Sequence, residues 1–329
     1  IVGTKLVGAL GAEALGGVGV AAMFMFLCYS LVSGTMRGVK VRAAWALGEG
    51  RRGEAIRYAQ AGAVIAFTSG LVIWVVGRDI SWAVRALGVD RALVEPAREF
   101  FAARTILAPA TCLVFALNQW RQGVGDTRTT MRLGVLANVI NAALAWALIH
   151  GHAGLPRLGV RGAGYATATA ELLQCLALAS ILVRESRAAT GAKRPETSLK
   201  RALGEVASLG LPTGLQFGAE MLAFTAFTAI LGGLGAREIA AHQVALAIIR
   251  VSFLPGVAVS EAGSVLVGKA LGANDLRRAD RVTRAALKIA TSFMALCGLG
   301  FAFGGALLAR GFTSDAAVVE VVRKLLFVG

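Results

Sequence analysis

The chain has 329 residues, of which 56% are hydrophobic and only 16% are charged, and its formal net charge is +15. Soluble domains are about 45–50% apolar and about 25% charged, so this composition excludes an ordinary soluble enzyme and a disordered chain. The positive charge does not indicate nucleic-acid binding, because the 34 Lys and Arg residues lie mostly between apolar runs, where membrane topology requires them.

Long uncharged stretches indicate that the chain crosses a membrane several times. Four of them, each of 20 residues or more, contain no Asp, Glu, Lys or Arg: Ala14–Met36, Tyr58–Gly77, Leu133–Pro156 and Ile289–Ala309. A helix that spans the hydrocarbon core needs about 20 such residues. The strands of an outer-membrane barrel would instead alternate with a period of two. The sequence therefore predicts an all-α polytopic membrane protein.

Spans and linkers follow in chain order. A first span is represented by residues 1–9, and further spans are predicted at about 13–37, 55–77, 98–120, 130–149, 162–184, 205–232, 238–267 and 280–309, with a tenth from Ala316 to the chain end. The polar stretch Arg184–Arg201 is the one long linker. We therefore predict an N-terminal lobe at 1–190, a cytoplasmic linker at 191–204 and a C-terminal lobe at 205–329.

Basic residues in the loops predict the orientation. If the long linker is cytoplasmic, the loops on its side (36–58, 118–132, 184–204 and 268–288) hold 21 Lys and Arg residues, and the opposite loops hold 8. Positive residues accumulate on the cytoplasmic side, so this assignment is preferred.

An internal repeat appears when the sequence is shifted by 224 residues. GALGAEAL at 8–15 then lies on GGLGAREI at 232–239, and residues 1–62 align without a gap to 225–286. After one inserted residue, DRALVEPAR at 90–98 lies on DAAVVEVVR at 315–323. A parallel repeat of six spans typically builds a transporter with a site between two lobes. By this measure the chain is predicted to carry about nine to ten of twelve spans, truncated at both ends.

Glu220 is the strongest candidate for a functional residue. It is the only charged residue in the 31-residue stretch Val206–Ala236. An acid at this depth is a functional candidate by default, and it can exchange a proton or attract a cation. Gln216 and Phe224 lie one turn away on the same helical face, which predicts a polar site with an aromatic wall. The alternative is a packing acid satisfied by a neighbour.

Span 8 carries three further candidates. Arg250 is predicted at a depth similar to that of Glu220, since both lie about 12 or 13 residues from the turn near 233–237. The two form an ion pair if their helices face each other; otherwise Arg250 snorkels or faces an aqueous cavity. His242, followed by Gln243, is a candidate proton-exchanging residue, but a lone histidine is more often a hydrogen-bonded structural residue.

Three residues of the first lobe form a second candidate group. Glu171 in span 6 and Asn138 in span 5 are predicted at similar depth and would make a polar site, or alternatively a satisfied interhelical hydrogen bond. Asn141 lies in the same span.

Arg37 and Glu261 align in the repeat near cytoplasmic span ends, which predicts either a gating salt bridge or two interfacial charges. No metal site is predicted.

Small residues and prolines mark candidate packing and bending points. Gly210, Gly214 and Gly218 have the four-residue spacing that favours close helix packing. Pro109, Pro212 and Pro255 each interrupt a predicted span and are expected to allow bending.

Several segments together resemble the multidrug and toxic compound extrusion (MATE) family. They are LPTGLQFGAEMLAF at 211–224, LGAREIAAHQVALAI at 234–248, FLPGVAVSEAGSVLVGKALGA at 253–273, QGVGDTRTTMR at 122–132 and LGVRGAGYAT at 158–167. The resemblance covers essentially the whole chain and implies two pseudo-symmetric six-helix lobes. It also departs from the family pattern: Gly3 stands where an acid is common, and Lys269 replaces the usual Gln.

The resemblance implies a secondary antiporter that exports small organic, often cationic, compounds against H⁺ or Na⁺. Glu220 occupies the position of the family's functional acid in span 7, and no cofactor is expected. We expect a multi-pass monomer in the lipid bilayer of a bacterial cytoplasmic (inner) membrane, with no nucleic-acid partner. The alternatives are a lipid-linked glycan flippase of the same superfamily and a transporter fragment that is not functional. A membrane-embedded enzyme is not expected, since no catalytic set lies at one depth.

Overall fold

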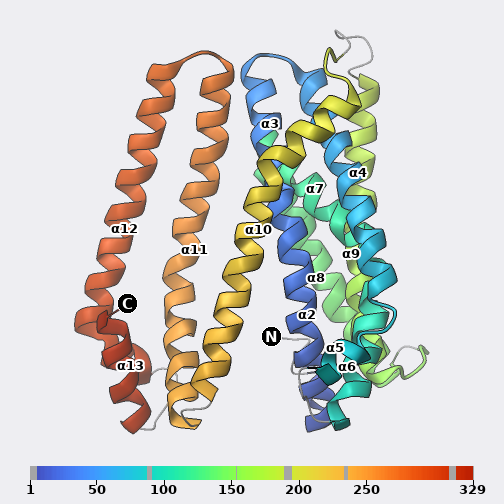
Figure 1. Cartoon of the computed structure of the whole chain (residues 1–329), viewed down its shortest axis with the longest axis vertical. Helices are drawn as coiled ribbons and strands as arrows, with labels where there is room; N and C mark the ends of the chain where they lie inside the picture. The colour runs from blue at the N-terminus through green and yellow to red at the C-terminus, as the bar shows by residue number, and fades with distance from the viewer. Residues whose placement is uncertain are drawn as a thin grey trace. The chain divides into compact units, whose positions relative to one another are not determined.

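The protein is all-helical in a computed structural model that describes residues 6–86, 91–152, 154–188, 195–232, 236–310 and 316–328. No strand is present in these ranges. The helices are α2 (Ala12–Thr35), α3 (Arg37–Gly48), α4 (Arg52–Val76), α5 (Ser81–Ala86), α6 (Arg91–Thr105), α7 (Ala108–Val124), α8 (Thr127–His150), α9 (Gly159–Ala188), α10 (Leu199–Gly232), α11 (Ala236–Gly272), α12 (Leu276–Arg310) and α13 (Ala316–Val328) (Figure 1).

Several helices are long and apolar enough to cross a membrane. Among the described residues six pass this test, and the bent pair α6–α7 makes a seventh. The six are Glu13–Gly48, Arg52–Val76, Thr127–His150, Gly159–Ala188, Val244–Gly272 and Leu276–Ala309. They follow the order of predicted spans 2, 3, 5, 6, 8 and 9, so the polytopic helical class is confirmed. The total of nine to ten spans stays a prediction, since spans 1, 7 and 10 are not in this set.

The predicted loop at 36–58 is largely helical, which corrects its assignment. Helix α2 passes into α3 at Met36, whose backbone N–H bonds to the Val32 carbonyl at 2.9 Å, and only residues 49–51 separate α3 from α4. The reason is packing: on α3, Lys40 and Ala43 are buried, and Gly123 of α7 lies against them. The positive charges of this region therefore sit partly on a packed helix end.

The described chain divides into two compact units, Ile1–Ala219 and Glu220–Gly329. In the first, α4 packs on α7 and α8 packs on α9; in the second, α11 packs on α12 and α13 (Figure 1). Helix α10 is continuous across the division, so its first half belongs to the first unit. The lobes expected at 1–190 and 205–329, with their linker, stay a prediction.

Helix boundaries repeat along the chain as the sequence repeat predicts. A shift of 224 carries Ala12, the first residue of α2, to 236, where α11 begins, and Gly48 to 272, where α11 ends. The same shift carries Arg52 to 276, the first residue of α12, and a shift of 225 carries Arg91 to 316, the first residue of α13. The second unit is thus built from the same succession of helices as the start of the first.

Glycines allow the first half of α10 to lie directly on α2 and α3. A side chain added at Gly34 would meet the Cα of Gly214 at 2.7 Å, and one added at Gly210 would overlap the backbone of Thr35. The predicted close packing is therefore confirmed for Gly210 and Gly214. A side chain added at Gly218 would meet nothing within 4 Å.

Predicted span 4 is broken rather than continuous. Helices α6 and α7 meet at an angle of 57°. Pro109 lies at the start of α7, where its missing N–H has no partner to lose, so the chain bends there as expected. The two other prolines that were expected to allow bending, Pro212 and Pro255, lie inside the continuous helices α10 and α11.

Labelling from outside tests the predicted orientation. Lys200, at the exposed start of α10, should be inaccessible as Lys200→Cys to an impermeant thiol reagent in intact cells, whereas Leu155→Cys in the exposed segment between α8 and α9 should react. A background without the four native cysteines serves as the control. The reverse labelling pattern would contradict the orientation.

Asp126 connects the α7–α8 turn to α9. It caps α8 by accepting the Thr129 backbone N–H at 3.0 Å, and it pairs with Arg121, which also pairs with Glu185 of α9. Burial alone would raise the pKa of Asp126, but the Thr129 hydrogen bonds and the Arg121 guanidinium together lower it from 3.8 to about 2. The turn within the QGVGDTRTTMR segment therefore has a structural role.

A depressed pKa predicts how pH acts at Asp126. Its contribution to stability is present above pH 3.8 and is lost as the pH falls through about 2. At pH 7, Asp126→Ala should lower the unfolding temperature in detergent, with the lost cap alone costing about 1 kcal/mol. Asp275→Ala is the matched control, because Asp275 accepts the Arg278 N–H in the same way. Equal effects of the two changes would contradict a role for the Arg121 pair.

Candidate functional site

A cluster of polar side chains forms at the break between α6 and α7. Arg104 lies in the last turn of α6, and Thr111 lies in the first turn of α7. Between them Leu107 serves as the N-cap of α7 without a side-chain hydrogen bond. The bend brings together two side chains that are seven residues apart in the sequence. Arg104 Nη1 donates a hydrogen bond to Thr111 Oγ1 at 3.1 Å.

Glu171 of α9 completes this cluster. Arg104 Nη2 donates to its Oε1 at 2.5 Å, and the Thr111 hydroxyl donates to its Oε2 at 2.5 Å. The Arg104 side chain is 9% exposed and that of Glu171 is 24% exposed. Three helices thus contribute to one ion pair, with Arg104 buried and Glu171 partly buried, in which both carboxylate oxygens accept a hydrogen bond.

The position of Glu171 along α9 places the pair deep in a membrane-spanning helix. It lies 12 residues after Gly159, the first residue of α9, which corresponds to about 18 Å along the axis. Charged groups at such depth are rare, and a buried pair gains little stability over apolar residues of similar volume. The cluster is therefore a candidate functional site.

Both helix ends at the break favour the charges beside them. Arg104 lies at the C-terminal end of α6, where the helix dipole is negative, and Glu171 contacts Thr111 at the N-terminal end of α7, where it is positive. In broken membrane helices, the amide end of one half favours an anion and the carbonyl end of the other favours a cation.

Tyr29 of α2 forms the remaining wall of the cluster. Its ring lies 5.6 Å from the Arg104 guanidinium carbon and packs edge-on against Phe115 at 5.9 Å. The ring face attracts the cation through its quadrupole. Within the described part of the chain, the Tyr29 hydroxyl is buried without a hydrogen-bond partner. The hydroxyl can therefore accept or donate one further hydrogen bond at this place.

The predicted asparagines lie elsewhere on α8. Asn138 is exposed and its Nδ2 donates to the Gly134 carbonyl of its own helix at 2.9 Å, so the hydrogen bonds of Glu171 go to α6 and α7 instead. Asn141 accepts a hydrogen bond from Thr167 of α9 at 3.2 Å, and both line a cavity of about 270 Å³.

On α10 the three predicted residues share one face. Gln216, Glu220 and Phe224 follow at four-residue intervals, and each side chain is exposed. Every one of them has an interaction within the protein. The helix therefore presents an acid, an amide and an aromatic ring in one row, as expected.

The residues of α11 are placed in part. The His242 ring packs edge-on against Phe227 at 5.3 Å, and its buried Nε2 has no hydrogen-bond partner among the described residues. Arg250 is exposed, and the side chain of Gln243 lies outside the described residues. Pairing of Arg250 with Glu220 stays a prediction.

The two predicted gate residues lie in different units. The Arg37 guanidinium lies over the Phe217 ring of α10, with its carbon 4.4 Å from the ring centroid. Glu261 is half-buried on α11. Their salt bridge stays a prediction.

Long apolar helices, a broken span and a buried ion pair define a multi-pass helical membrane protein with polar groups inside the membrane. The MatE family model matches residues 1–147 and 212–328. The chain belongs to this family.

Known relatives agree with the assignment. The chain is 29% identical over 299 residues to a probable multidrug resistance protein NorM of Burkholderia mallei, covering 90% of this chain and 63% of the relative. It is 27% identical to the multidrug resistance protein PmpM of Pseudomonas aeruginosa, covering 78% and 54%. It therefore spans less than two thirds of these relatives. A crystal structure of a MATE protein in the bent conformation matches with a TM-score of 0.86 at 20% identity, covering 99% of this chain and 72% of that one, which supports the fold.

Proposed function

We propose that the protein is a secondary antiporter that exports small organic, often cationic, compounds in exchange for H⁺ or Na⁺ across the cytoplasmic membrane of a bacterium. The observation that carries the proposal is the buried Glu171–Arg104 pair at the break of a membrane-spanning helix pair. Membership of the MatE family and the multidrug resistance names of the relatives support the class of substrate.

Glu171 would act as a coupling acid of the first lobe. In the arrangement described, Arg104 and Thr111 donate to the two carboxylate oxygens of Glu171. Binding of either ion to Glu171 must release Arg104, whose guanidinium then needs a new partner. The Tyr29 ring face already lies 5.6 Å from the guanidinium carbon and would keep this contact after the release. Uptake of the ion would thus change the contacts that fix the α6–α7 break.

Glu220 would serve the same purpose in the second lobe. It stands in a row with Gln216 and Phe224 on α10, which gives an organic cation a carboxylate, an amide and an aromatic face. An ion and a cationic substrate would compete for this carboxylate, so binding of one would release the other. Competition of this kind couples export of the substrate to entry of the ion. We further propose that the protein acts as a monomer in the lipid bilayer and needs neither a cofactor nor nucleic acid.

Proteoliposomes test this proposal. With an imposed gradient of H⁺ or Na⁺, the purified protein should move a fluorescent organic cation such as ethidium against its concentration gradient. Dissipation of the ion gradient with an ionophore should stop the transport. Movement that continues unchanged after dissipation would contradict ion coupling.

A further inference from the structure

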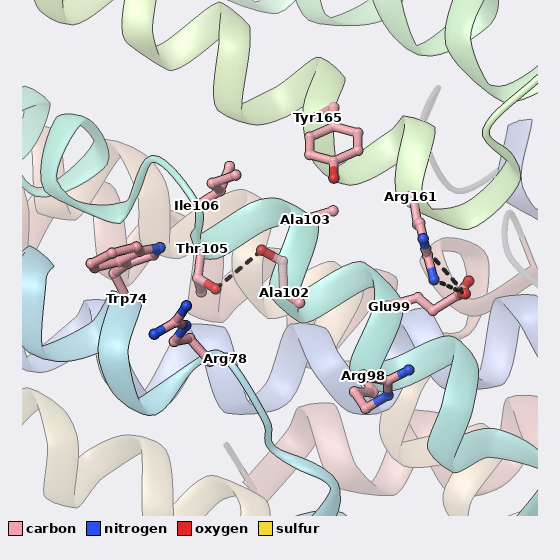
Figure 2. A pocket seen from close by; sticks show the side chains of 10 residues that line it. All are labelled: Trp74, Arg78, Arg98, Glu99, Ala102, Ala103, Thr105, Ile106, Arg161 and Tyr165. Atoms are coloured by element: carbon pink, nitrogen blue, oxygen red, sulfur yellow. Dashed lines mark hydrogen bonds and ion pairs between the residues drawn. The ribbon is translucent and has the colours of Figure 1, made fainter. Parts of the chain in front are cut away.

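A polar cavity lies in the first unit, and neither Glu171 nor Arg104 lines it. It measures about 350 Å³ and lies between α4, α6 and α9. Arg78, Arg98 and Arg161 line it together with Trp74 and Tyr165, and Glu99 is the one acid in the lining (Figure 2). Three cations therefore converge on one small space.

The ion pairs in the cavity leave donors available. Arg98 uses Nε and Nη2 to bond Glu95 at 3.0 and 2.5 Å, and Arg161 uses the same two nitrogens to bond Glu99 at 3.1 and 2.7 Å. A guanidinium carries five N–H donors, so Nη1 of each can still donate to a further acceptor.

Arg78 is the least engaged of the three arginines. Among the residues that the structure describes it forms no ion pair, and its guanidinium carbon lies 5.4 Å from the centre of the Trp74 ring. In Figure 2 its guanidinium lies beside Thr105, and the Tyr165 hydroxyl points down toward the α6 helix that carries Ala102 and Ala103. The cavity thus offers an anion the Arg78 guanidinium, which has no ion pair among the described residues, the free nitrogens of Arg98 and Arg161, and the Tyr165 hydroxyl.

The surroundings of the cavity fit the membrane–water boundary. Arg78 follows the last residue of α4 by two positions, and Arg161 lies in the first turn of α9. Val72 and Val75 on the last two turns of α4 are exposed, and so is Ile106 in the cavity lining. Trp and Tyr are the residues that prefer this depth. Of the exposed apolar residues, Ile106 lines the cavity and forms its apolar rim, so arginines and an apolar edge lie together, as the headgroup level of a membrane requires.

We propose that this cavity binds the phosphodiester headgroup of an anionic phospholipid, with the phosphate on Arg78 and on Nη1 of Arg98 and Arg161. Arginine guanidinium groups match phosphate oxygens in geometry, and the apolar rim accommodates the start of an acyl chain. A free phosphate ion would use the same arginines but would not need the rim.

Native mass spectrometry of the purified protein with phosphatidylglycerol tests the proposal. Arg78→Gln leaves both ion pairs in place and should weaken phosphatidylglycerol binding about tenfold, because it removes one charge-assisted contact. Arg85→Gln is the matched control, since Arg85 is an exposed arginine of the neighbouring α5 that does not line the cavity; it should change binding less than about twofold. Phosphatidylcholine carries the same phosphodiester but adds a choline cation that the three arginines repel, so it should bind wild type more weakly than phosphatidylglycerol does.

Three results would overturn the proposal. Wild-type affinity of Arg78→Gln, in a variant that elutes and melts like wild type, would show that the cavity does not bind the lipid. Equal losses in the Arg78 and Arg85 variants would show general attraction of negative lipid to positive protein. Displacement of phosphatidylglycerol by inorganic phosphate would assign the site to a free anion.

Discussion

Replacing Glu220 with Gln should abolish export driven by an H⁺ or Na⁺ gradient while leaving membrane insertion intact. Gln keeps the size and hydrogen bonding of the side chain but cannot exchange a proton or attract a cation. The measurement is gradient-driven uptake of ethidium into proteoliposomes. Glu320→Gln is the matched control, because Glu320 is an exposed acid of the same unit that pairs with Arg323 one turn away, and it should transport like wild type.

The predicted pairing with Arg250 gives this experiment a second arm. If the two residues pair, Glu220→Gln leaves Arg250 uncompensated and lowers expression as well. The double change Glu220→Gln with Arg250→Met should then recover expression but not transport. Wild-type export by Glu220→Gln would place the coupling acid elsewhere.

Removing either partner of the Glu171–Arg104 pair should destabilise the protein. Glu171→Gln leaves the buried Arg104 without its charged partner, at a cost of roughly 3–5 kcal/mol, whereas Arg104→Met should cost less, because Glu171 is 24% exposed and keeps its bond to Thr111. The double variant should regain most of this stability but not transport, because the cluster can no longer change its charge. Unfolding temperature in one detergent and transport in proteoliposomes are measured for all three variants.

An exposed pair controls for the removal of charge. Arg284 and Asp280 pair at 2.9 Å on the surface of α12, with side chains 73% and 55% exposed. Arg284→Met should cost at most about 1 kcal/mol. If Glu171→Gln is equally mild, the buried pair does not carry the role assigned to it.

The sequence predicts the helices well where charge and glycine mark their ends. The 224-residue repeat anticipated the starts of α11 and α12, because the polar turns that interrupt apolar runs are retained in both copies. The prediction of a loop at 36–58 is wrong because it rests on charge alone, on Arg37, Lys40 and Arg42. Val39, Ala43 and Ala46 lie at helical spacing and form the buried face of α3. Charge composition alone cannot separate a loop from a packed helix end.

The partners of Glu171 were not predicted. Arg104 and Glu171 are 67 residues apart, and their contact depends on how α6 and α9 pack, which no local pattern records. The available signal was indirect: an arginine inside predicted span 4, five residues before Pro109. A proline that interrupts a membrane span leaves backbone groups without helical hydrogen bonds. A charged residue nearby indicates that this break is a polar site within the protein.

Ion movement measured together with substrate movement tests the central claim most directly. Proteoliposomes loaded with a pH- or Na⁺-sensitive dye receive an organic cation on one side and no imposed gradient. Ion-coupled antiport predicts that transport of the cation drives H⁺ or Na⁺ in the opposite direction, and that Glu171→Gln and Glu220→Gln abolish this ion signal. Translocation of a lipid-linked glycan by the same protein, with no ion movement in response to any organic cation, would contradict the account and favour a flippase.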